Sequence, residues 1–178
     1  MLFMLAILSI LILFYSNENL KSHFVDIPYK HFKDNHHKAH FLTAYEIFKE
    51  NKIFGSGAKT FRYLCMDKKY EKIKTKYVEN RCSTHPHNIY LEILSETGFL
   101  GVFILFMINI YIILFLVKNF IKRNFLKQEI LILFCNFFIL FWPLQTTGAF
   151  FSTWNGIFYW IFFSYFFNLK KNLTDHPK

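Results

Sequence analysis

The sequence predicts an all-α integral membrane protein with about four spans, the first one truncated, and one large helical extracytoplasmic loop. Three observations carry this prediction. Hydrophobic residues make up 53% and aromatic residues 21% of the 178 positions, with 25 Phe against only 6 Gly and 4 Pro. The apolar residues form long blocks instead of the alternating face of a soluble fold. Many lysines flank these blocks or fill the polar stretch between them, which is typical of membrane topology.

The net charge of +9 would also suit a nucleic-acid-binding protein. Such a protein presents its basic residues on a folded platform. Here the basic residues border apolar blocks or lie in the polar loop, where they suit anionic lipid head groups. The pattern therefore favours membrane lipid as a partner and disfavours nucleic acid.

The first apolar block, residues 1–15, predicts a truncated transmembrane helix. A helix needs about 20 residues to cross a bilayer, and this block is shorter. A signal peptide begins with basic residues and ends at a small-residue cleavage site, and the block has neither. We therefore expect the end of a spanning helix, and a chain that is the C-terminal fragment of a longer protein.

Three further spans are predicted downstream. The block Gly98–Val117 carries no charge and is long enough to cross once. The block Ile130–Leu169 is also uncharged and is about twice as long as one crossing, with a break at Pro143. We expect two spans there, at 130–144 and 151–169, joined by a tight hairpin.

The short basic segments orient the chain. The connection at 118–128 and the tail at 170–178 are both basic, and short basic segments lie on the cytoplasmic side of a membrane. The polar loop at 16–97 then lies on the opposite side, and the hairpin at 145–150 joins it there. Residues 98–169 hold the three later spans between these regions.

The cysteines agree with this topology. Cys65 and Cys82 lie in the polar loop, whereas Cys135 lies inside a predicted span. An oxidising compartment permits a disulfide between the first two. Closing a loop of that size stabilises it by roughly 3 kcal/mol on the chain-entropy model. The alternative is two unpaired thiols, and we favour the disulfide.

The polar loop contains one clear helical pattern at residues 39–51, where apolar side chains recur at intervals of three and four. The preceding stretch, 16–38, shows no sustained period. Gly55-Ser56-Gly57 ends the helix and opens a turn. A short aromatic segment follows at 60–65, and residues 66–80 form a solvated excursion whose ends the two cysteines would join.

A second helix is predicted to begin near Pro86 and to carry His87 close above the membrane surface. The unperturbed pKa of histidine, near 6.5, suits proton transfer at neutral pH. The alternative is a capping or packing histidine. Glu92 and Glu96 share a neighbouring face of this helix with Asn88, and we interpret both carboxylates as solvated.

Three cations of the loop are candidates for binding an anion. Lys59 and Arg62 follow the turn Gly55-Ser56-Gly57, and a glycine-containing turn with exposed N–H groups and two cations can hold a phosphate. Arg81 is a third cation near His87. For each cation the alternative is a solvated loop charge.

No metal or other cofactor is expected. His36 and His40 are one helical turn apart and His37 lies between them, but no carboxylate accompanies them at zinc-like spacing. The sequence contains no nucleotide-binding glycine motif and no serine nucleophile elbow.

The stretch that runs from His87-Asn88 across nine residues to Gly98-Phe99-Leu100-Gly101 resembles the signature of the O-antigen ligase family. That signature is His, then Asn, Ser or Gln, nine residues, Gly, two residues and Gly. The sequence matches each fixed position. The resemblance covers roughly 39–169 and includes the segments Cys82–Pro86, Phe54–Gly57 and Phe61-Arg62.

The resemblance implies a glycosyltransferase of the cell envelope, multi-pass in the bacterial inner membrane, with its large loop periplasmic. Its donor would be a polyprenyl-diphosphate-linked glycan. A ligase passes the glycan to lipid A-core in lipopolysaccharide biosynthesis, and an O-antigen polymerase passes it to another repeat unit. By this resemblance Arg62 would contact the diphosphate and His87 would activate or position the acceptor. Lys59, Arg81 and Asn88 would be secondary substrate contacts.

The sequence departs from the family pattern in two respects. Members of the family have about twice this length and more spans. Many ligases also carry an Arg in the loop helix, where this sequence has His40 and Phe41. Three alternatives therefore stay open: a non-catalytic remnant, half of a split enzyme that works with a companion N-terminal polypeptide, and a module that binds glycan or lipid head groups.

Overall fold

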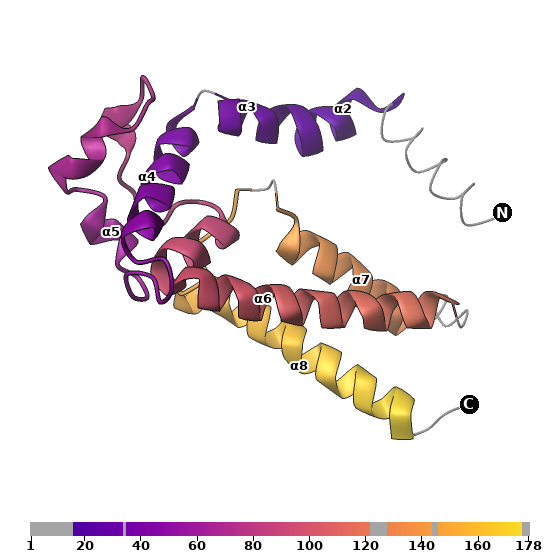
Figure 1. The fold of residues 1–178 in the computed structure, drawn as a ribbon. Helices are drawn as coiled ribbons and strands as arrows, with labels where there is room; N and C mark the ends of the chain where they lie inside the picture. The colour runs from indigo at the N-terminus through magenta and orange to yellow at the C-terminus, as the bar shows by residue number, and fades with distance from the viewer. Residues whose placement is uncertain (1–15, 34, 122–127, 144–145, 176–178) are drawn as a thin grey trace.

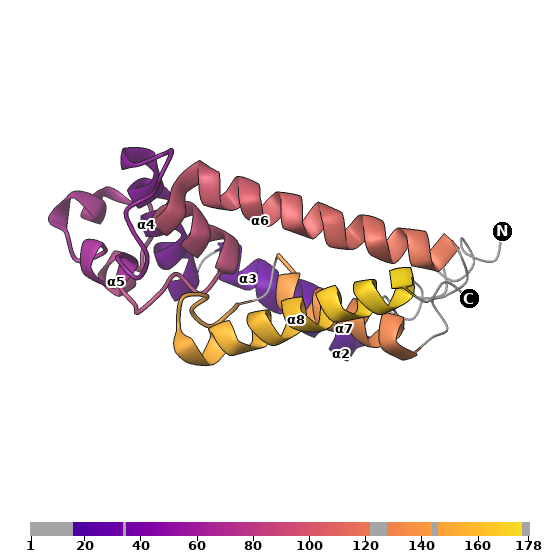
Figure 2. The ribbon, with the colours of Figure 1, turned by 90° about the horizontal axis from the view of Figure 1, so that it is seen from below.

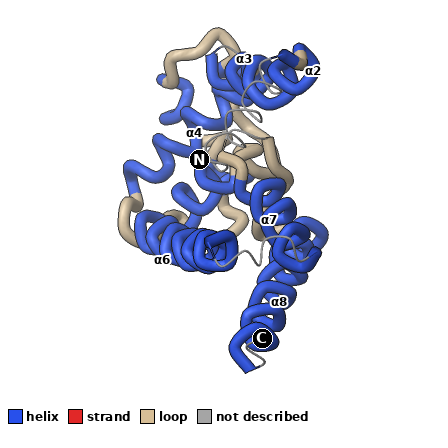
Figure 3. Tube along the Cα trace, turned by 90° about the vertical axis from the view of Figure 1, so that its right-hand side faces the viewer, coloured by secondary structure: helices blue, strands red, loops and turns tan. Residues whose placement is uncertain are grey.

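The computed structural model describes residues 16–33, 35–121, 128–143 and 146–175, and within these ranges all regular structure is helical (Figures 1 and 3). The predicted all-α class is therefore confirmed for this part of the chain. The predicted truncated span at 1–15 lies outside the described residues, as does most of the basic connection at 118–128.

Three long helices run alongside one another: α6 (Ile89–Ile121), α7 (Gln128–Phe141) and α8 (Thr153–Asp175) (Figures 1 and 2). They share one buried apolar core, to which the three helices contribute Ile112, Leu133 and Phe166, respectively. Residues 36–88 of the polar part gather at the end where α6 begins. This end of the bundle is where the candidate site lies.

Among the described helices, the stretch Ile89–Asn119 of α6 is long and apolar enough to cross a membrane by length and composition. Helix α7 has 14 residues and is shorter than the span predicted at 130–144, whereas α8 covers most of the span predicted at 151–169. Large apolar side chains of α6 and α8 point outward, with Leu114 62% and Trp160 72% exposed. An apolar exterior of this kind suits lipid.

The N-terminal part of the polar loop is helical, which the sequence pattern did not predict. Helix α2 (Glu18–Lys21), a π-helical segment (Ser22–Asp26) and α3 (Ile27–Lys33) follow one another. The side chain of Asn17 caps α2 by accepting two backbone N–H groups. The described side chains here are mostly exposed, so these helices have no buried face that an apolar period could record.

Helix α4 (His36–Glu50) packs against α6 and places its buried face, including Ala44 and Ile47, near the short helix α5 (Phe61–Leu64). It begins three residues before the predicted helix at 39–51, because Asn35 caps it by accepting the N–H of His36. The additional turn brings His37 onto the helix.

The excursion between the cysteines is joined at its base. Cys65 and Cys82 form a disulfide, with their Cα atoms 5.1 Å apart. The guanidinium of Arg81 donates hydrogen bonds to the carbonyl oxygens of Cys65 (3.0 Å) and Met66 (3.3 Å) and pairs with Glu71 at 3.2 Å. Two 3-10 turns, Lys68–Lys72 and Val78–Asn80, lie within the excursion.

Candidate functional site

Helix α6 bends sharply at Gly98, which has φ 68° and ψ −164°. The bend exposes backbone N–H groups, and the loop after α4 accepts two of them: Phe99 donates to the Lys52 carbonyl (2.7 Å) and Leu100 to the Ile53 carbonyl (3.2 Å). A Cβ on Gly98 would overlap the Ile53 carbonyl oxygen. The first glycine of the signature is therefore required by both its backbone angle and its close neighbour.

The turn Gly55-Ser56-Gly57 is not an anion cradle, contrary to the sequence-based interpretation. Its three N–H groups donate to the carbonyl oxygens of Asn51 (2.8 Å), Ser95 (3.0 Å) and Glu96 (2.8 Å). A Cβ on Gly55 would overlap the backbone of Glu96. The glycines let the turn approach α6 closely, and the N–H groups are used in that contact.

Glu92 and Glu96 are buried, at 1% exposed each, so the prediction of a solvated face was wrong. The Glu96 carboxylate accepts the backbone N–H groups of Lys59 (2.5 Å) and Phe61 (3.1 Å). The Glu92 carboxylate accepts those of residues 150–151 at 2.8 and 3.3 Å. Each carboxylate satisfies loop donors that would otherwise be buried without a partner, and so joins a loop to α6.

Burial raises the pKa of Glu92 to about 7, although the N–H groups of residues 150–151 act in the opposite direction. Burial also raises the pKa of Glu96. Both residues precede Gly98 and lie outside the predicted span at 98–117. A carboxyl whose pKa is higher in the folded than in the unfolded state stabilises the fold at low pH, and this stabilisation is lost as the pH rises through the folded-state value.

The contribution of Glu92 to the free energy of unfolding is therefore expected to fall by something on the order of 3 kcal/mol between about pH 4.5 and pH 7, whereas the lowered pKa of His40 and of His87 makes their contributions rise with pH. Glu92→Gln stays neutral over this range, so the Tm of this variant should rise relative to that of wild type as the pH increases. The measurement is the Tm in detergent micelles from pH 4 to pH 8. Glu79→Gln, on the exposed excursion, is the matched control. Equal slopes in both variants would contradict the assignment.

His87 lies two residues before α6 and not on it, which corrects the sequence prediction. Its backbone is left-handed, with φ 59°. Asn88 begins the helix instead: its side-chain oxygen accepts the N–H groups of Tyr90 and Leu91 at 3.1 Å, and its amide donates to the Pro143 carbonyl at 2.9 Å. Asn88 is only 4% exposed. These contacts give Asn88 a capping role, and its assignment to substrate binding stays a prediction.

The segment that follows α7 holds His87 in place. Thr147 donates its N–H to the His87 carbonyl at 2.9 Å, and its own carbonyl lies 3.0 Å from Nε2 of His85. The His87 ring is half-buried, and its Nε2 lies 3.0 Å from the hydroxyl of Ser83. Thr147 belongs to the hairpin predicted at 145–150, and nothing in its local sequence pattern indicates this contact.

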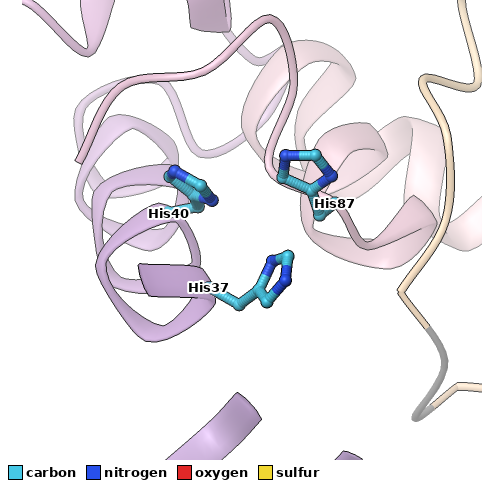
Figure 4. A group of neighbouring side chains, drawn as sticks. All are labelled: His37, His40 and His87. Carbon is cyan, nitrogen blue, oxygen red and sulfur yellow. The ribbon is translucent and has the colours of Figure 1, made fainter. Parts of the chain in front are cut away.

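Two histidines of α4 approach His87 from the opposite side (Figure 4). The ring centroids of His37 and His40 lie 5.0 and 5.1 Å from that of His87. Burial, reinforced by the neighbouring histidines, lowers the pKa of both His40 and His87 to about 4, so both rings are neutral at pH 7. His36, which the sequence grouped with His40, instead faces Tyr77 at 4.6 Å between centroids.

The three predicted cations have different surroundings. Arg62, half-buried on α5, has an Nε that is buried without a hydrogen-bond partner in the described structure. Burial lowers the pKa of His85, and the positive charge of Arg62 lowers it further. Burial raises the pKa of Glu92, and the same charge acts in the opposite direction. Arg81 holds the base of the excursion, and the side chain of Lys59 is exposed. Arg62 is thus the cation that combines partial burial with available donors.

These features define a helical protein whose polar chemistry, an arginine and a group of neutral histidines, lies where a long apolar helix begins. Residues 1–107 match the family model described as O-antigen ligase. The chain belongs to this membrane-associated family, which indicates an O-antigen ligase- or polymerase-like function with glycan or lipid-linked substrates. The match includes Arg62 and the whole signature at 87–101. Comparisons with curated proteins and with solved structures found no match.

Proposed function

We propose that this protein is an O-antigen ligase-like glycosyltransferase of the bacterial inner membrane, with residues 16–97 on the periplasmic side. It transfers a glycan from a polyprenyl-diphosphate carrier to lipid A-core in lipopolysaccharide biosynthesis. The observation that supports the proposal is an indirect link between Arg62 and His87 through His85. The charge of Arg62 acts on His85, whose ring centroid lies 4.2 Å from that of His87.

The site supports a direct displacement. The acceptor hydroxyl oxygen forms a bond to the anomeric carbon of the donor glycan, and the bond from that carbon to the diphosphate oxygen breaks. The neutral imidazole of His87 takes the hydroxyl proton. Arg62 offers a positive charge and N–H donors to the departing diphosphate, whose negative charge increases as the bond breaks.

The bundle also contains an apolar pocket that could hold the carrier lipid. An apolar pocket of about 410 Å³ lies between α6 and α7, and its lining includes Phe106, Phe138 and Trp142. A pocket with this lining suits a polyprenyl chain. Its lining also includes Tyr90, in the first turn of α6.

Reconstitution tests the proposal. The chain is placed in nanodiscs with a polyprenyl-diphosphate-linked oligosaccharide and lipid A-core, and the products are separated. Glycan on lipid A-core is the expected result, whereas longer lipid-linked chains would identify a polymerase. If a folded chain gives neither product, it is not self-sufficient. The experiment is then repeated with a companion polypeptide to test the split-enzyme alternative.

Arg62→Gln is expected to lower the transfer rate on the order of 100-fold, because the substitution removes the charge that stabilises the leaving group while keeping a similar size. The measurement is the initial transfer rate in the same nanodiscs. Lys72→Gln removes an equal charge from the exposed excursion and is the matched control. A wild-type rate in folded Arg62→Gln would exclude a diphosphate contact at this position.

A further inference from the structure

The histidine group at the start of α6 has the geometry of an incomplete metal-binding site. His37 and His40 are three residues apart on α4 and face the same side, toward His87 (Figure 4). The potential ligand atoms of the three rings all lie within 4.8 Å of one another. A tetrahedral zinc site with Zn–N bonds near 2.1 Å separates its nitrogens by about 3.4 Å, so side-chain rotations on the order of 1 Å would complete it.

The outward hydrogen bonds of two rings leave one nitrogen of each available to a metal. His40 is 7% exposed, its ring bonds to the backbone of Asn80, and its Nδ1 is buried without a hydrogen-bond partner. His87 bonds through Nε2 to Ser83. Metal-binding histidines are typically oriented in this way, with one ring nitrogen held by an oxygen and the other on the metal.

The type of ligand atom indicates which class of metal ion the site would bind. All three are imidazoles, which suit zinc and its transition-metal neighbours, whereas magnesium and calcium prefer oxygen ligands. Three protein ligands would leave the fourth position of a tetrahedral ion for water.

We propose that His37, His40 and His87 bind one divalent transition-metal ion of the zinc type, and that the bound ion withholds His87 from proton transfer. With Nδ1 on the metal and Nε2–H directed at Ser83, the His87 ring has no lone pair left to accept a proton. The metal site stands on the geometry of the histidines alone. Its effect on transfer rests on the proposed function.

The first arm of the test measures binding with Co²⁺, whose tetrahedral complexes absorb strongly in visible light. Tag-free, chelator-treated protein in nanodiscs is titrated. One Co²⁺ per chain is expected, displaced by Zn²⁺ but not by Mg²⁺. His40→Ala and the less buried His37→Ala should each weaken binding at least about 100-fold. His36→Ala, on the same helix but facing Tyr77, is the matched control and should bind as wild type does.

Absence of saturable binding, or equal binding by all variants, would overturn the metal site. Two variants of different burial are used so that misfolding of one does not decide the result, and near-ultraviolet circular dichroism checks both. The binding arm needs no glycan transfer, so it decides the metal site even if the proposed function fails.

The second arm measures glycan transfer with and without Zn²⁺, each variant being compared with its own metal-free rate. Zinc should inhibit wild type, EDTA should restore the rate, and His37→Ala should need at least about 100-fold more zinc for the same inhibition. If saturating zinc leaves the rate of glycan transfer unchanged, the ion has no regulatory role, and the proposed function still holds. Absence of transfer in metal-free protein would instead contradict the proposed function.

Discussion

Replacing His87 by asparagine is expected to lower the rate of glycan transfer by roughly 100- to 10 000-fold, which is the usual contribution of a positioned general base. Asparagine is the informative replacement because residue 87 has φ 59°, a left-handed conformation that asparagine tolerates better than alanine. The imidazole is lost while the backbone, and with it the hydrogen bond from Thr147, can be retained.

The rate is measured under saturating donor and acceptor, where the loss should appear in kcat because the base acts on the proton as the new bond forms. His36→Asn, which removes an exposed imidazole of α4, is the matched control and should transfer at the wild-type rate. If folded His87→Asn keeps the wild-type rate, His87 is not the base. His85, whose ring centroid lies 4.2 Å away, then becomes the first alternative.

The features that follow from local pattern could be predicted from the sequence. Uninterrupted apolar blocks indicated the helices now seen as α6, α7 and α8, and the break at Pro143 indicated where α7 ends. Cys65 and Cys82 were predicted to pair because both lie in the polar loop, where an oxidising compartment permits a disulfide. In each case the information lies within the segment itself, so no knowledge of its neighbours is needed.

The features that depend on distant segments could not be predicted in this way. A carboxylate such as Glu92 is interpreted as solvated until its neighbours are known, and its partners, at residues 150–151, belong to the segment before α8. The histidine group likewise combines α4 with the start of α6, whereas local spacing pairs His36 with His40. The chemistry of histidine and the signature both pointed to His87, but neither indicated that His37 and His40 lie beside it.

Gly98→Ala is expected to destabilise the protein strongly, although it adds only one methyl group. The combination of φ 68° and ψ −164° lies in a region that is essentially restricted to glycine, and it costs a residue with a Cβ on the order of 1–3 kcal/mol. The new Cβ would also overlap the Ile53 carbonyl oxygen and the Gly55 nitrogen, which are backbone atoms and cannot rotate away. Relieving the overlap would move the loop and break the hydrogen bond from Phe99 to Lys52. We expect a total loss of about 3 kcal/mol or more.

Gly156→Ala provides the matched control, because it adds the same methyl group within α8, where the nearest neighbour outside the helix backbone would be the Phe150 carbonyl oxygen at an ordinary 3.6 Å. Alanine favours a helix over glycine by up to about 1 kcal/mol, so this variant should unfold at the same temperature as wild type or higher. The measurement is thermal unfolding in detergent micelles, with limited proteolysis of the loop at 51–60 as a local readout. Equal stability of Gly98→Ala and wild type would mean that the bend in α6 does not depend on glycine. The fixed spacing between His87 and Gly98 would then need an explanation other than the packing of the loop at 51–60 against the bend.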